Sequence, residues 1–169
     1  MRTINISLKP LLFLAVFCLI GCINVNDFGI YWNKGVVDPA LEGYWLSEHG
    51  ECNHYVKHDD HYEITQDGSI IKTLPMDGAT FLMIKSRDEQ FIYKYTANQD
   101  TFTLYNPQRA IEKEFKQQYD TANIIIDRHT VTIDQLDGDV VKILEDISQK
   151  PNYWETATVF EKQESACGN

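Results

Sequence analysis

The chain has 169 residues, of which 25 are acidic and 15 are basic, so its formal net charge at pH 7 is −10. An acidic surface repels phosphate backbones and anionic headgroups, which argues against a nucleic-acid-binding protein and against broad electrostatic contact with a membrane. A chain of this length is expected to fold as one domain with a sizeable buried core.

The first 21 residues have the order of an export signal. Arg2 and Lys9 precede the apolar run LLFLAVFCLI and the small Gly21, a succession of charged, apolar and small residues that is typical of secretory signals. A ten-residue helix covers about 15 Å, too little to cross a hydrocarbon core of roughly 30 Å. We therefore predict that residues 1–21 are a signal peptide outside the fold.

The four residues LIGC, Leu19 to Cys22, resemble the bacterial lipobox. The resemblance implies a mature chain that begins at a lipidated Cys22, and several acyl chains, at about 0.8 kcal/mol per buried methylene, would make such an anchor effectively permanent. The next residue is Ile23, where an aspartate usually retains such proteins at the inner membrane, so the expected location is the outer membrane, facing the periplasm. The alternative is a buried thiol beside an ordinary cleavage site.

Cys52 and Cys167 would be the cysteines left in the folded part, because Cys18 leaves with the signal and Cys22 carries lipid. In an oxidising compartment they can pair, and a loop of about 115 residues corresponds to ~4 to 5 kcal/mol in the chain-entropy estimate. Cys167 lies close to the C-terminus, where chains are often poorly ordered. Both a disulfide and two free thiols therefore remain open.

A folded domain is expected over residues 38–162, after a lipidated tether (22–37) and before a tail (163–169). Asp38 is expected to cap a single helical turn that begins at Pro39. Beyond it, short runs with a period of two alternate with turn signals such as Asp67-Gly68, a pattern typical of an antiparallel meander. The predicted strands are residues 44–48, 53–57, 62–66, 70–74, 80–86, 90–96, 101–105, 123–127, 130–134 and 153–162.

Two helices are predicted to interrupt the strands. Residues 106–119 begin with the capping pair Asn106-Pro107 and place apolar residues at every fourth position. Residues 137–150 carry an i, i+3, i+4, i+7 apolar stripe and end before Pro151. Because large sheets curl and closure removes their edges, we expect a mainly β fold in which an antiparallel up-and-down meander forms a partly open barrel with two short α-helices.

The predicted elements resemble those of lipocalin-type β-barrels. The segment ALEGYW places Gly43 and Trp45 in the Gly-x-Trp start of those barrels, although the Thr-Asp-Tyr triplet of lipocalins does not occur. The stretch from Phe81 to Phe115, with the following isoleucine-rich hairpin, helix and final strand, is similar to a group of small bacterial lipoproteins. Over residues 38–162 this resemblance implies a lipocalin-like, partly open barrel anchored in the cell envelope.

Patterns of catalytic residues are missing from the sequence. It contains no Gly-x-Ser-x-Gly elbow, no phosphate-binding glycine loop and no His-Glu-x-x-His zinc helix. We therefore expect neither an enzyme nor a cofactor.

Four of the five histidines lie between residues 49 and 61. On one strand, His54 and His58 would be about 13 Å apart, too far to share a zinc ion. His58 and His61 flank a two-residue turn, which would place their Cβ atoms about 5 Å apart. These two could hold a metal weakly; the alternative is that polar residues simply occupy an exposed turn.

An aromatic stripe alternates along one predicted strand at Phe91, Tyr93 and Tyr95, with Phe81 and Phe102 on neighbouring strands. The stripe is either barrel core or the lining of a groove for an apolar ligand. We expect a non-enzymatic binding module for an apolar or amphipathic ligand or a protein partner. The alternative is an immunity-type or inhibitor lipoprotein whose acidic surface binds a basic protein partner.

Overall fold

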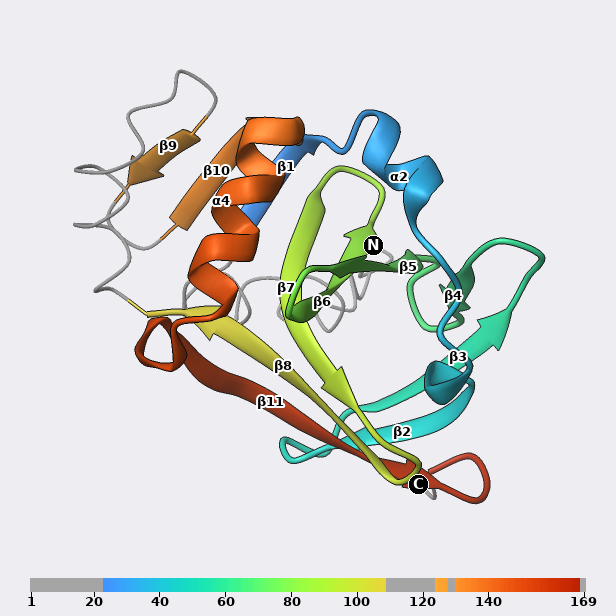
Figure 1. The fold of residues 1–169 in the computed structure, drawn as a ribbon. Helices are drawn as coiled ribbons and strands as arrows, with labels where there is room; N and C mark the ends of the chain where they lie inside the picture. The colour runs from blue at the N-terminus through green and yellow to red at the C-terminus, as the bar shows by residue number, and fades with distance from the viewer. Residues whose placement is uncertain (1–22, 109–123, 128–129, 168–169) are drawn as a thin grey trace, which may run out of the picture.

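The computed structural model describes residues 23–108, 124–127 and 130–167. Within these residues eleven strands form one sheet, and eight of them close into an antiparallel barrel (Figure 1). The predicted up-and-down barrel is confirmed, but it is closed and not partly open, because β11 pairs both with β8 and with β2, the first strand of the meander. The barrel strands are β2 (Gly43–Ser47), β3 (Cys52–Lys57), β4 (Tyr62–Ile64), β5 (Ile70–Met76), β6 (Ala79–Lys85), β7 (Gln90–Ala97), β8 (Thr101–Pro107) and β11 (Trp154–Gln163).

Three further strands extend the sheet beside the barrel. β1 (Ile23–Asp27) pairs antiparallel with β7 and parallel with β10 (Thr130–Gln135), which pairs with β9 (Ile124–Asp127). The start of β7 pairs with β1, whereas its second half, from Lys94 onward, pairs with β8. One edge of β7 therefore serves two different strands.

Helix α4 (Gly138–Ser148) covers this extension, and its prediction is confirmed. Asp137 caps it by accepting a hydrogen bond from the Val140 amide at 2.9 Å. The predicted apolar stripe is buried against β1, β6 and β10, and Figure 1 shows α4 lying across β1 and β10. Helix and extension thus form a second layer on the outer face of β6 and β7.

Two hydrophobic cores follow from the strand period of two. The inner core takes residues from all eight barrel strands, and the outer core lies between the barrel wall, the extension and α4. The inner core consists of Leu41, Trp45, Tyr55, Tyr62, Ile71, Leu82, Phe91, Tyr93, Tyr95, Phe102, Leu104, Ala157 and Phe160. The outer core consists of Ile23, Val25, Phe28, Leu74, Phe81, Met83, Ile92, Val131, Ile133, Leu136, Val140, Ile143, Leu144, Ile147 and Trp154.

The structure differs from the tether predicted over residues 22–37. Its described part forms β1 and the short helix α2 (Ile30–Lys34), and both are docked on the barrel. Ile23 and Val25 are buried in the outer core, each 2 % exposed. Val36 pairs with Thr73 of β5 through two backbone hydrogen bonds of 2.7 and 2.9 Å.

The helical turn predicted at Pro39 is confirmed as η2 (Pro39–Leu41), with the Asp38 carboxylate accepting a hydrogen bond from the Ala40 amide at 2.9 Å. The helix predicted over residues 106–119 begins differently. Asn106 and Pro107 are the last residues of β8, because they pair with Glu155 and Trp154 of β11. Residues 109–119 lie outside the described residues.

Gly35 lies close against the barrel wall. A Cβ at this position would lie 2.6 Å from Met83 Cε and 2.9 Å from Lys72 Cβ. We expect Gly35→Ala to lower the free energy of unfolding by about 1 to 3 kcal/mol, because the backbone must shift to make room. Urea denaturation measures this change.

Gly138→Ala is the matched control for this substitution. The nearest atom to its Cβ would be 3.7 Å away, and α4 begins at this residue, so alanine is expected to be neutral or slightly stabilising. Equal denaturation midpoints for the two variants would contradict the close approach at Gly35.

Candidate functional site

The predicted aromatic residues divide between the two cores. Phe91, Tyr93, Tyr95 and Phe102 belong to the inner core, with at most 5 % exposure. Phe81 belongs to the outer core and packs edge-on against Trp154, with ring centroids 5.9 Å apart. The reason is the register of β6 and β7, which places Phe81 opposite Lys94. The structure therefore brings together four of the five residues.

Aromatic rings pack closely in the inner core. Phe102 stacks on Phe160 at 4.3 Å and meets the edges of Trp45 and Tyr55 at 4.8 and 5.8 Å. The Tyr95 hydroxyl donates a hydrogen bond of 3.0 Å to the Asp38 carboxylate. Burial, followed by this carboxylate, raises the pKa of Tyr95. These side chains occupy the interior of the barrel as a packed core.

On the outer surface, the β3–β4 hairpin brings His58 and His61 together. The His58 amide donates a hydrogen bond of 2.9 Å to the His61 carbonyl, across the turn Asp59-Asp60. Their imidazole rings stack with centroids 4.9 Å apart and an interplanar angle of 12°. The other two histidines of this stretch lie apart from the pair: His54 stacks on Tyr44 at 3.9 Å, and His49 lies 3.9 Å from Glu48.

Each stacked imidazole faces a carboxylate of its own. His58 Nε2 lies 3.2 Å from Glu63 Oε2, and His61 Nδ1 lies 2.8 Å from Asp60 Oδ1. The other oxygen of Asp60 accepts a hydrogen bond of 2.8 Å from Lys72 Nζ. Hydrogen bonds from Lys72 and then from His61 lower the pKa of Asp60 to about 2. Lys72 is only 4 % exposed, so its ammonium depends on Asp60 for neutralisation.

An open depression lies beside this turn, and we call it the hairpin hollow. It is lined by Glu42, Lys57, His58, Asp59, Asp60 and His61. Three carboxylates face one ammonium here, and the carboxylate of Asp60 also has Lys72 as a partner. The hollow therefore favours a positively charged group.

The metal prediction for His58 and His61 remains a prediction. In the part of the chain that the structure describes, no group of three or more His, Cys, Asp or Glu side chains is arranged to hold a metal ion. The nitrogen lone pairs of an imidazole lie in the plane of its ring. Because the two rings are nearly parallel, their lone pairs do not converge on one point, and a shared metal ion would require one ring to rotate.

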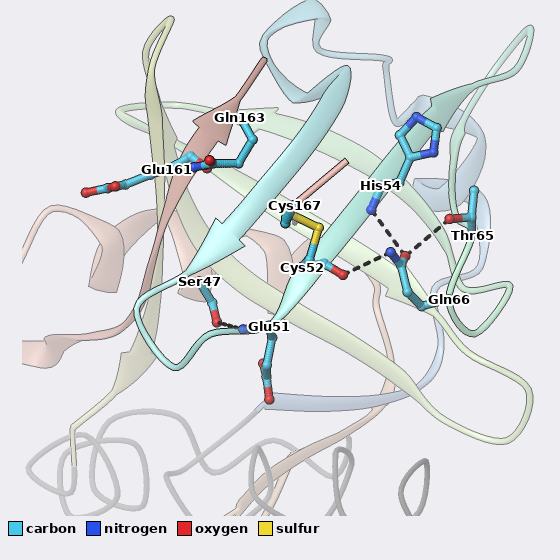
Figure 2. The surroundings of a disulfide bond; sticks show 9 residues. All are labelled: Ser47, Glu51, Cys52, His54, Thr65, Gln66, Glu161, Gln163 and Cys167. Carbon is cyan, nitrogen blue, oxygen red and sulfur yellow. Dashed lines mark hydrogen bonds between the residues drawn. A yellow bond between two sulfur atoms is a disulfide. The ribbon is translucent and has the colours of Figure 1, made fainter. Parts of the chain in front are cut away.

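Cys52 and Cys167 form a disulfide, with Cα atoms 5.9 Å apart. Cys52 begins β3, and Cys167 lies four residues beyond the end of β11, so the bond ties the C-terminal segment to the barrel. Figure 2 shows Gln66 next to it. The Gln66 side chain accepts a hydrogen bond from the His54 amide at 3.2 Å and donates one to the Cys52 carbonyl at 2.9 Å. The disulfide stabilises the scaffold near the hairpin.

Three residues next to the hairpin hollow were not found by sequence reasoning. Lys72 stands in the predicted strand IIKTL, where nothing in the pattern marks a lysine as buried. Glu42 is one of many acidic residues, and Trp32 stands in the predicted tether. A useful signal would have been the unusual Tyr31-Trp32 pair, because a half-buried tryptophan needs a packing surface.

Comparison of the chain with protein-family models, curated proteins and solved structures finds no match. The class of the protein is therefore defined by the fold alone. It is an antiparallel eight-stranded closed barrel, consistent with a lipocalin-like barrel. Among the described residues, no helix is long and apolar enough to cross a membrane.

Removal of the disulfide is expected to destabilise the domain. The bond closes a separation of 115 residues, and the double variant Cys52→Ser/Cys167→Ser should lower the free energy of unfolding by about 2 to 4 kcal/mol, because the unfolded chain gains freedom. Urea denaturation with and without dithiothreitol measures the effect. The reductant should lower the midpoint of the parent and leave the double variant unchanged; a parent insensitive to full reduction would refute the stabilising role.

The pKa of the Asp60 carboxyl should lie below the usual value of an aspartate. Since Lys72 is the main cause of its low pKa, we expect Lys72→Met to raise the pKa from about 2 toward the usual range, as followed by carboxyl-carbon NMR. Lys57→Met is the control, because Lys57 lines the hollow but makes no described bond to Asp60. Equal pKa changes in both variants would show that general charge, and not the Lys72 contact, is responsible.

Proposed function

We propose that the chain is a lipid-anchored protein of the bacterial cell envelope, on the periplasmic face of the outer membrane, that binds a protein partner and catalyses no reaction. The observation that carries the choice of a protein partner is the packed inner core, in which buried side chains from all eight barrel strands form one cluster and the rings on β8, β11, β2 and β3 touch one another. A ligand inside the barrel would have to displace them, which favours binding on the outer surface.

The charge of the molecule supports a basic partner. Removal of residues 1–21 takes away Arg2 and Lys9 and no acid, which changes the formal net charge from −10 to −12. Complementary charge accelerates encounter and selects partners. An inhibitor or immunity-type protein, which neutralises a basic protein in the periplasm, is one form of this proposal.

The docking of β1 gives the proposed anchor a particular geometry. Ile23, the residue after Cys22, is already buried between β7 and β10. A lipid on Cys22 would therefore be joined to the sheet without a tether, and the barrel would lie close to the membrane surface with limited freedom to turn.

Replacement of the lipidation site tests the anchor. In bacteria fed a radiolabelled or alkyne fatty acid, the parent chain should take up label and sediment with membranes, whereas Cys22→Ala should do neither. Cys18→Ala is the control, because Cys18 lies within the proposed signal. Equal labelling of Cys22→Ala, or an unlabelled parent, would overturn the anchor; the binding of a protein partner is tested separately below.

A further inference from the structure

Two large apolar side chains are exposed among the described residues, and both flank α2. Ile30 at its start is 64 % exposed, and Val36 just after its end is 47 % exposed. Isolated exposed apolar residues are common, but these two share one short segment that is held rigidly. Val36 is fixed by its backbone pairing with Thr73, so the pair would lose little conformational freedom on binding.

Trp32 holds α2 between these two residues. Its ring stacks on Phe28 with centroids 5.7 Å apart and lies 4.3 Å from Lys85 Nζ and 5.3 Å from Lys72 Nζ. Cation–π contacts of this kind favour one ring orientation. We call Ile30, Trp32 and Val36 the apolar edge.

The apolar edge and the hairpin hollow are linked through Lys72 and through one segment of the chain, and together they form the proposed binding face. Lys72 connects them directly, because its ammonium contacts both the Trp32 ring and the Asp60 carboxylate. The chain also connects them, since the segment after Val36 leads through η2 to Glu42, which lines the hollow. In Figure 1 this segment runs from α2 past β4 to η2 beside β3.

The charges on this face indicate which chemical group would bind there. The Lys72 ammonium is already neutralised by Asp60, which leaves Glu42 and Asp59 in the hollow opposite Lys57. A positive group with several donors would match these acceptors.

Arginine matches the hollow better than lysine. The stacked rings of His58 and His61 offer a flat aromatic face, on which a planar guanidinium can stack while it forms paired hydrogen bonds with a carboxylate. Carboxylates at this position disfavour an anionic membrane surface, and a second copy of so acidic a chain would be repelled.

We propose that the hairpin hollow binds an arginine side chain of a basic protein partner, while the apolar edge contacts an apolar residue next to that arginine. The inference rests on the proposed function, in which the partner is a protein, and assigns the surface that this partner occupies. It requires no chemical step.

Short peptides test the site without knowledge of the partner. The isotope-labelled mature chain carrying Cys22→Ser is titrated by NMR with the peptides acetyl-Gly-Leu-Arg-Leu-Gly-amide, its lysine analogue and its citrulline analogue, which has the shape of arginine without the charge. Shifts should be confined to residues 30–36, 42 and 57–61, with affinity in the order arginine, lysine, citrulline. Shifts spread over the surface, or equal affinity for arginine and citrulline, would overturn the proposal.

Matched variants assign the effect to the two parts of the face. Glu42→Gln and Ile30→Ser should each weaken binding of the arginine peptide about threefold or more, as expected for partly exposed contacts. Glu155→Gln, an equal change of an exposed glutamate on β11, should leave affinity unchanged. Asp60 is left intact, because its loss would leave Lys72 buried without its partner. Equal affinities of all three variants would overturn the site.

Photo-crosslinking in the periplasm separates this site from the proposed function. A photoreactive residue replaces Lys57 in the hollow in one variant and Glu155 in another. Crosslinking to a basic protein from position 57 that is reduced in Glu42→Gln supports the site. Crosslinking from position 155 alone overturns the site but keeps the protein-binding function. Binding of phosphatidylglycerol vesicles by the delipidated chain through Ile30 would replace a protein by a membrane and overturn both.

Discussion

The rest of the structure depends on β7, because both cores are built on its two faces. Phe91, Tyr93 and Tyr95 point into the barrel, whereas Ile92 faces the outer core and Lys94 donates a hydrogen bond of 2.9 Å to the Ser148 carbonyl at the end of α4. Its edge is likewise divided between β1 and β8. A change on this strand would therefore affect barrel and extension together, and the two are expected to unfold as one unit.

The sequence predicted most elements of the fold, but not which face of each strand points into the barrel. The period of two marks strands well, yet β6 is covered on both sides, so Phe81, Leu82 and Met83 are all apolar although they alternate between cores. Nothing in the strand itself tells which face points inward; the pairing of Phe81 with Lys94 decides it. β1 was missed for a related reason, since its parallel pairing with β10 joins residues more than one hundred positions apart.

The part of the candidate site that depends on local geometry was predicted from the sequence. A two-residue turn was sufficient to place His58 and His61 side by side, and the structure places them so. The partners that give this turn its charge come from elsewhere: Lys72 from β5, Glu63 from β4 and Glu42 from the end of η2. Lys72 and Glu42 reach the turn from the next strand of the meander and from the end of η2, and no short spacing in the sequence reveals such contacts.

Lys72 fixes the turn that lines the hairpin hollow. A lysine with 4 % exposure is costly unless a carboxylate neutralises it, and Asp60 does so from the tip of the hairpin. This bond fixes the turn, and with it the stacked imidazoles, while it withdraws one carboxylate from the hollow. The carboxylates of Glu42 and Asp59 remain free to attract a cation, and neither residue belongs to a hydrophobic core. This surface therefore separates the residues that hold the scaffold, Lys72 and Asp60, from Glu42 and Asp59, so the charge of the hollow can change while the scaffold is kept.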